Sequence, residues 1–245
     1  MAFLRAIHTF YSFFLFSLLF GLLLPVLLIP IFFPKQFQLV GVINRLWARL
    51  LFKLVFLPYE VTCETELDPG RQYIFCPNHF SHLDIPTLGL NPINAIFVGK
   101  SEMETIPLFG FMYRKLHITV NRASLKSKFT ALKQSLDALD EGKSLVIYPE
   151  GGIITQNPPY MVKFKEGAFR AALEKKVAIV PVTIPFNWKI MPDEKKQRLH
   201  RAKISVIFHA PIETSGLTPD HMDLLKEKVF HTIQQELLRQ NQLNS

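Results

Sequence analysis

Asn78-His79-Phe80-Ser81-His82-Leu83-Asp84 follows a short apolar run of β-type residues and places a histidine five positions before a carboxylate. On a regular helix this offset would turn the two side chains about 140° apart, so they meet only if a turn lies between them. The spacing therefore predicts a loop between a strand and a helix. A histidine oriented by a carboxylate is also a common arrangement for a general base.

Short β-type runs alternate with helix-like segments along the rest of the chain. This alternation is typical of an α/β fold with a mostly parallel sheet, because each crossover helix returns the chain to the same edge. The expected strands cover residues 59–64, 72–76, 95–98, 117–120, 144–148, 177–184 and 203–209. The sequence predicts one α/β domain whose mostly parallel sheet is flanked by helices.

Two of the expected helices carry an apolar stripe. The first runs from Ser124, a suitable N-cap, to Glu141, and Gly142 ends it. We expect its stripe to lie in the core: Leu125, Phe129, Leu132, Leu136 and Leu139. The second follows Pro219, and its stripe consists of Met222, Leu225, Val229, Ile233 and Leu237.

The first residues of the chain differ from the rest in composition. No Lys, Arg, Asp or Glu occurs from Ala6 to Pro34, a run rich in Phe and Leu that would cover roughly 30 Å of hydrocarbon as a helix. A secretory signal peptide is the competing interpretation, but the run is too long and shows no small-residue cleavage pattern. We expect a membrane segment, bent by Pro25 and Pro30, that either enters one leaflet or spans the bilayer.

A second apolar stretch carries Arg45, Arg49 and Lys53 at intervals of four, which places the three charges on one helical face. This pattern predicts an interfacial helix that faces anionic cytoplasmic lipid. We expect the two helices to form a membrane-anchoring hairpin over residues 1–57, followed by the α/β domain over residues 58–245.

The net charge of +8 on 245 residues suits an acidic partner. Nucleic acid is one possibility, but no helix-turn-helix, zinc-finger or aromatic-repeat signature accompanies the charge, so no nucleic-acid partner is expected. Anionic membrane phospholipid is favoured because an apolar anchor is present. Cys63 and Cys76 lack metal-ligand spacing and fall on neighbouring expected strands, which indicates reduced core thiols, or a disulfide bridge if the domain were exported.

Further blocks follow the histidine motif in a fixed order: Gly99-Lys100-Ser101-Glu102 with Ile106-Pro107-Leu108-Phe109-Gly110, Asn121-Arg122, Tyr148-Pro149-Glu150-Gly151-Gly152, and Val180-Pro181-Val182. In order and separation, this set resembles the glycerolipid acyltransferases of the lysophosphatidic acid acyltransferase (PlsC-like) family. The resemblance runs from about residue 60 to residue 210, and the ordered set is far more specific than any one block.

The resemblance implies a general base and a head-group site. His79 would take the proton of an acceptor hydroxyl, and Asp84 would fix the imidazole tautomer. Lys100 and Arg122 would neutralise an acidic head group, with ordinary solvated cations as the alternative. His82 lies at a variable position of the motif, and no fourth ligand is apparent nearby, so no metal is expected.

The third block departs from the family pattern. Family members usually read Phe-Pro-Glu-Gly-Thr-Arg, whereas this chain has Gly152 and Ile153 in place of the threonine and arginine. The resemblance assigns Glu150 to the acceptor site, where Gly151 and Gly152 would present backbone amides to phosphate or to an oxyanion. Lys163 and Lys165 are candidates to replace the missing arginine, or they begin a helix as solvated residues.

These features predict a membrane-anchored 1-acylglycerol-3-phosphate O-acyltransferase on the cytoplasmic face of the cell membrane. The donor would be the thioester of acyl-carrier protein or of coenzyme A, and no cofactor is expected. The altered third block motivates a second acceptor class, a lyso-aminolipid such as an ornithine or glycine lipid, or another lysophospholipid. A more remote alternative is a membrane lipid-binding module without catalysis.

Overall fold

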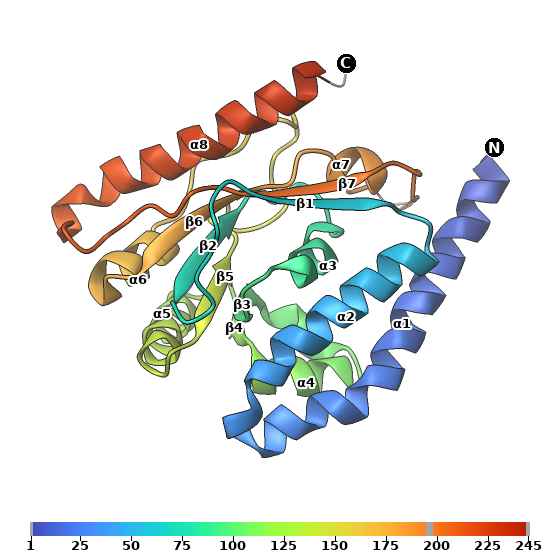
Figure 1. Ribbon diagram of the computed structural model, residues 1–245, viewed down its shortest axis with the longest axis horizontal. Helices are drawn as coiled ribbons and strands as arrows, with labels where there is room; N and C mark the ends of the chain where they lie inside the picture. Colours follow the sequence, from blue (N-terminus) through green and yellow to red (C-terminus); the bar gives the residue numbers. More distant parts are fainter. Residues whose placement is uncertain (1, 195–197, 244–245) are drawn as a thin grey trace.

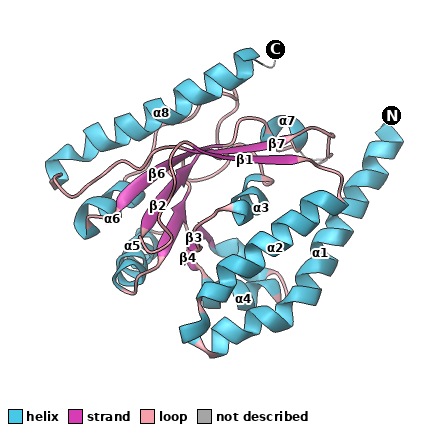
Figure 2. Ribbon diagram, in the orientation of Figure 1, coloured by secondary structure: helices cyan, strands magenta, loops and turns pink. Residues whose placement is uncertain are grey.

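The computed structural model describes residues 2–194 and 198–243, and its centre is a seven-stranded sheet in the order β1-β7-β6-β2-β5-β3-β4 (Figure 2). Neighbouring strands are parallel except β6 and β7, which confirms the mostly parallel α/β fold. The strands are β1 Tyr59–Cys63, β2 Tyr73–Pro77, β3 Ala95–Lys100, β4 Ile118–Val120, β5 Ser144–Ile147, β6 Ala178–Thr183 and β7 Ile204–Phe208.

Helices cover both faces of this sheet (Figure 1). Helices α5 (Leu125–Asp140), α6 (Gly167–Lys175) and α8 (Met222–Leu243) share one core with the side chains of Ile74, Leu145 and Ile179. The opposite side carries α1 (Ala2–Phe32), α2 (Gln38–Leu54), α3 (Asp84–Thr87) and α4 (Phe109–Leu116). Short elements complete the chain: η1 Pro34–Gln36, η2 Leu88–Leu90, η3 Ser101–Thr105, α7 Asn187–Ile190 and η4 Pro219–His221.

The alternation of side chains along each strand divides the core. On β2, Ile74 and Cys76 face the α5, α6 and α8 layer, whereas Tyr73 and Phe75 face the other side. Every residue of β2 is buried because both faces are covered, as expected for a central parallel strand. The carboxyl end of β2 therefore lies between two packed layers.

Helices α1 and α2 form the expected hairpin. Helix α1 is long and apolar enough to cross a membrane, and most of its side chains face away from the protein core. Pro25 and Pro30 lie within it, and Figure 1 shows its last turns curving toward α2. The imidazole Nε2 of His8 contacts the carbonyl oxygen of Val55 at 2.8 Å, and Phe16 packs edge-on against Trp47. The apolar helix suits membrane association, and the division of the chain at residue 57 stays a prediction.

Two local expectations differ from the structure. Leu125 and Phe129 are 80% and 72% exposed, because α5 places the smaller Ala131, Ser135 and Ala138 against the sheet and leaves its first turns at the surface. The N-cap is confirmed, since the backbone N–H of Ser127 donates to Oγ of Ser124 at 3.2 Å. The stripe on α8 is confirmed from Leu225 onward, with Val229, Ile233 and Leu237 also buried.

The second difference concerns the cysteines. Cys63 and Cys76 do not lie on neighbouring strands, because β7 and β6 separate β1 from β2. Both thiols are free, and only Cys76 is buried.

Candidate active site

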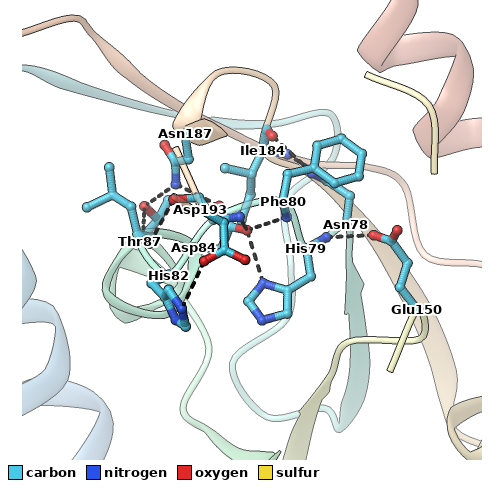
Figure 3. A network of polar contacts seen from close by, with 12 residues as sticks. Asn78, His79, Phe80, His82, Asp84, Thr87, Glu150, Ile184, Asn187 and Asp193 are labelled. Atoms are coloured by element: carbon cyan, nitrogen blue, oxygen red, sulfur yellow. Dashed lines mark hydrogen bonds and ion pairs between the residues drawn. The ribbon is translucent and has the colours of Figure 1, made fainter. Parts of the chain in front are cut away.

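The histidine motif forms a loop between β2 and α3, as the spacing predicts (Figure 3). The side chain of Asn78 fixes the start of this loop through two hydrogen bonds with the backbone of Ile184, just after β6. Its Nδ2 donates to the carbonyl oxygen at 3.0 Å, and its Oδ1 accepts from the N–H at 2.7 Å. The loop is therefore anchored to the strand that neighbours β2.

His79 and Asp84 face each other across the loop. Nδ1 of His79 lies 3.1 Å from Oδ2 of Asp84, and the same oxygen accepts from the backbone N–H groups of Phe80 and Ser81 at 2.8 and 2.9 Å. A carboxylate only accepts, so this contact places the imidazole proton on Nδ1 and leaves the lone pair of Nε2 for a substrate proton. The geometry is that of a general base held by a buried carboxylate.

Asn187 completes the support of Asp84. Its Nδ2 donates to Oδ1 of Asp84 at 3.0 Å and to Oγ1 of Thr87 at 2.9 Å (Figure 3). Asn187 begins α7, 103 residues after Asp84, and all three side chains are fully buried or nearly so. The sequence analysis missed Asn187, because no local pattern links it to the histidine motif.

Glu150 lies behind the loop, and its side chain is fully buried. Its Oε1 accepts from the backbone N–H of His79 at 2.7 Å, and its Oε2 accepts from the N–H of Val162 at 3.2 Å. Burial raises the pKa of Glu150 to about 7, the two N–H bonds oppose that rise, and the charge of Asp84 adds to it. Glu150 thus holds the backbone of the base and does not lie open to an acceptor.

Tyr148 stacks on the imidazole of His79, with ring centroids 4.0 Å apart and planes 26° apart. Its hydroxyl is buried and has no hydrogen-bond partner within residues 2–194 and 198–243. Burial, then the charge of Asp84, then Tyr113 raise the pKa of Tyr148 well above its usual value, so the phenol stays protonated. The ring fixes one face of the base, a role that the sequence analysis did not assign.

The structure brings Arg122 to Gly152, and a place for Lys100 at the head-group site stays a prediction. A Cβ on Gly152 would lie 2.9 Å from Nη1 of Arg122, and a Cβ on Gly151 would contact the side chain of Lys165. Both glycines have positive φ, +85° at Gly151 and +153° at Gly152, which favours glycine. Lys100 is exposed and pairs with Glu102 at 3.3 Å. Arg122 and Lys165 therefore place two cations against Gly151 and Gly152, and these four residues form a cationic cluster.

A cavity of about 390 Å³ lies between the hairpin and the catalytic domain. Its wall is mostly apolar and includes Phe16, Phe20, Trp47 and Met112. His82 and Leu83 of the loop between β2 and α3 also line it, so the cavity adjoins the loop that carries His79. His82 pairs with Asp193 at 3.5 Å, and no group of three potential metal ligands occurs in the part of the chain that the structure describes.

The motifs and this geometry can be compared with known proteins. The family model described as Acyltransferase matches residues 59–185, more than half of the chain. This chain belongs to the acyltransferase family. The match begins at β1, ends just after β6, and includes every element that carries His79, Asp84 and the two glycines.

The names of the relatives of this acyltransferase refer to two kinds of acceptor. It is 27% identical over 241 residues to a 1-acyl-sn-glycerol-3-phosphate acyltransferase of Chlamydomonas reinhardtii, covering 97% of this chain and 72% of that protein. It is 34% identical over 155 residues to the lyso-ornithine lipid O-acyltransferase of Pseudomonas aeruginosa, covering 62% of this chain and 56% of that protein. The chain spans about half the length of two chloroplast relatives, 52% and 49%.

The fold of this acyltransferase also matches a solved structure. The crystal structure of PlsC, the 1-acyl-sn-glycerophosphate acyltransferase of Thermotoga maritima, superposes with a TM-score of 0.76 at 21% identity. The match covers 97% of this chain and 98% of that chain. The likeness therefore extends over the hairpin as well as the sheet.

Proposed function

We propose that this acyltransferase moves a fatty acyl group from a thioester to the free hydroxyl of 1-acylglycerol 3-phosphate, which yields phosphatidic acid. The observation that carries the proposal is the buried dyad of His79 and Asp84, on a loop that lines an apolar cavity, together with the cationic cluster at Gly151 and Gly152. A base, an anion site and an acyl site are the three parts that this reaction requires.

The chemistry needs no side-chain nucleophile. Nε2 of His79 takes the proton of the acceptor hydroxyl while the hydroxyl oxygen attacks the thioester carbonyl carbon. Asp84 stabilises the imidazolium that forms. When the tetrahedral intermediate collapses, the carbon–sulfur bond breaks, the imidazolium returns its proton to the thiolate, and an ester and a free thiol leave. The substrates supply every reacting bond, so no cofactor and no metal take part.

The cationic cluster supports an acceptor that carries a phosphate. Arg122 offers a fork of donors beside Gly152, and Lys165 lies over Gly151, so the phosphate would meet two cations. Burial lowers the pKa of Arg122 below its ordinary value. A phosphate dianion would offset that cost of burial, because it pairs with the guanidinium.

The donor chain fits the apolar cavity. A lysolipid can leave its own chain in the bilayer, whereas the chain of a water-soluble thioester needs an apolar place on the enzyme. The cavity lies between the hairpin and the loop that carries His79, so a chain bound there would lie beside that loop. Because acyl-carrier protein and coenzyme A thioesters are cytosolic, the active site would face the cytoplasm, with α1 in the membrane.

A lyso-aminolipid acceptor is the second candidate. Gly152 and Ile153 replace the usual threonine and arginine, and the Pseudomonas aeruginosa relative acts on a lyso-ornithine lipid by its name. The deciding experiment assays purified enzyme on lysophosphatidic acid, lyso-ornithine lipid and lyso-glycine lipid, each with acyl-coenzyme A and acyl-carrier protein. We expect the highest kcat/KM on lysophosphatidic acid. Activity on a lyso-aminolipid alone would replace the acceptor and keep the reaction class.

A further inference from the structure

Tyr113 and His117 are two of the polar side chains in the wall of the cavity, which also includes Ser12, Asn44 and His82, and the acyl transfer above uses neither of these two. His117 follows the end of α4, and Tyr113 lies one turn before it. Both line the cavity, and their ring centroids are 5.1 Å apart. Phe97, Phe109 and Met112 line the same part of the wall. Tyr113 and His117 therefore form one polar position among these apolar side chains.

His117 presents a proton on Nε2. Its Nδ1 lies 3.2 Å from the backbone N–H of Phe97, which is a donor, so Nδ1 accepts and the ring proton sits on Nε2. Burial lowers the pKa of His117 to about 4, which keeps the ring uncharged near pH 7. Among the residues that the structure describes, Nε2 has no hydrogen-bond partner.

Tyr113 places its hydroxyl against the β3 backbone at Gly99. A Cβ at Gly99 would lie 1.7 Å from that hydroxyl oxygen, so this position requires glycine. Burial raises the pKa of Tyr113 to about 12, Arg122 opposes that rise and Glu104 adds to it, so the phenol is protonated. No described residue forms a hydrogen bond with this hydroxyl. Two adjacent polar groups thus lack partners within the protein.

An unsubstituted hydrocarbon chain would leave both groups unpaired. An unpaired buried donor costs about 1–3 kcal/mol, whereas a ligand oxygen at the same place would restore a hydrogen bond. A chain hydroxyl suits the pair, because its oxygen can accept from Nε2–H of His117 while its proton is donated to the Tyr113 oxygen.

We propose that His117 and Tyr113 form a polar contact for an acyl chain that carries a hydroxyl group, so that hydroxyacyl thioesters are the preferred donors. The inference rests on the proposed function, in which this cavity holds the donor chain. It adds a preference for hydroxylated acyl chains, which neither the dyad of His79 and Asp84 nor the cationic cluster determines.

The test compares acyl-coenzyme A donors of equal chain length, unsubstituted or with one hydroxyl at successive positions, in competition for lysophosphatidic acid. We expect at least one hydroxy isomer to exceed the unsubstituted chain about tenfold in kcat/KM, the value of one hydrogen bond. In Tyr113→Phe and His117→Phe that ratio should fall toward one. Tyr59→Phe, which removes a hydroxyl outside the cavity, should keep the wild-type ratio.

The outcomes separate this inference from the proposed function. Transfer of unsubstituted chains with no preference for any hydroxy isomer would overturn the inference and leave the proposed function standing. A preference that persists in Tyr113→Phe and in a folded His117→Phe, checked by thermal melting, would also overturn it. If no donor supports transfer to any lysolipid, the proposed function fails and this inference with it.

Discussion

The backbone N–H of His79 donates to Oε1 of Glu150 at 2.7 Å, so a carboxyl group 71 residues further along the chain holds the backbone of the base. The second oxygen of Glu150 accepts from the N–H of Val162, which ties the loop after β5 to the same group. Glu150 therefore links the loop after β2 to the loop after β5, and its protonation state affects both.

Glu150 gives the fold a pH dependence. Its pKa is raised from 4.5 to about 7, so the folded protein holds an extra proton between these values. The contribution to stability is fully present below pH 4.5 and is lost as the pH rises through 7, by roughly 3 kcal/mol in all. The melting temperature of Glu150→Gln minus that of wild type should therefore increase from pH 5 to pH 8. A difference that stays constant over this range would mean that the carboxyl does not titrate there.

Asn187 should affect kcat only through its hydrogen bond with Asp84. Asn187→Leu removes the donor to Oδ1 of Asp84 with little change of volume, and a hydrogen bond to a charged group contributes about 1.5–3 kcal/mol. We expect kcat to fall about 10- to 100-fold while the KM for the acceptor stays constant. Thr87→Val, which removes the other partner of Asn187 and the hydrogen bond from Thr87 to the carbonyl oxygen of Leu83, is the matched control and should lose much less. Equal losses in the two variants would assign the effect to packing.

Arg122 should distinguish acceptors by charge. Arg122→Ala removes the guanidinium beside Gly152, so the KM for lysophosphatidic acid should rise at least about tenfold more than that for an uncharged monoacylglycerol. Lys100→Ala is the comparison, because that side chain is exposed and paired with Glu102, and its effect should be smaller. A uniform loss on both acceptors would make Arg122 a scaffold residue.

The exposed face of α1 should bind the bilayer. Removing the whole hairpin would uncover core residues, since Ala48, Leu51 and Phe52 of α2 pack with residues of the catalytic domain, so point changes are the sharper test. Phe10→Glu and Phe14→Glu place charges at positions that are 75% and 56% exposed. We expect the double variant to lose most of its sedimentation with anionic vesicles, because a buried charge in the apolar layer costs several kcal/mol. Unchanged sedimentation would locate membrane binding elsewhere.

The strands and the histidine loop could be predicted from the sequence because their signals are local. A buried parallel strand is a short apolar run bounded by turn residues, and all seven runs correspond to strands with ends that differ by one or two residues. The offset from His79 to Asp84 required a turn, and the structure contains it. The prediction that the α5 stripe lies in the core was wrong at Leu125 and Phe129, because periodicity cannot show which flank of a helix meets the sheet.

The supporting residues of the site could not be predicted, because their contacts depend on tertiary packing. Asn187 reaches Asp84 only because β6 lies beside β2 and turns directly into α7. Lys100 is exposed and pairs with Glu102, so its place at the head-group site stays a prediction, while Arg122 lies against Gly152. His117 and Tyr113 showed no motif, since a cavity wall is assembled from several elements.

The central claim is that His79 is the general base, and the most direct measurement is the turnover of His79→Ala on lysophosphatidic acid in vesicles. Loss of a general base lowers kcat about 100- to 10,000-fold, which is roughly 3 to 5 kcal/mol of barrier. His231→Ala, an exposed histidine on α8, is the control and should keep wild-type turnover. We predict a loss in that range for His79→Ala, with vesicle binding and melting temperature unchanged. Turnover within tenfold of wild type in His79→Ala would contradict the account.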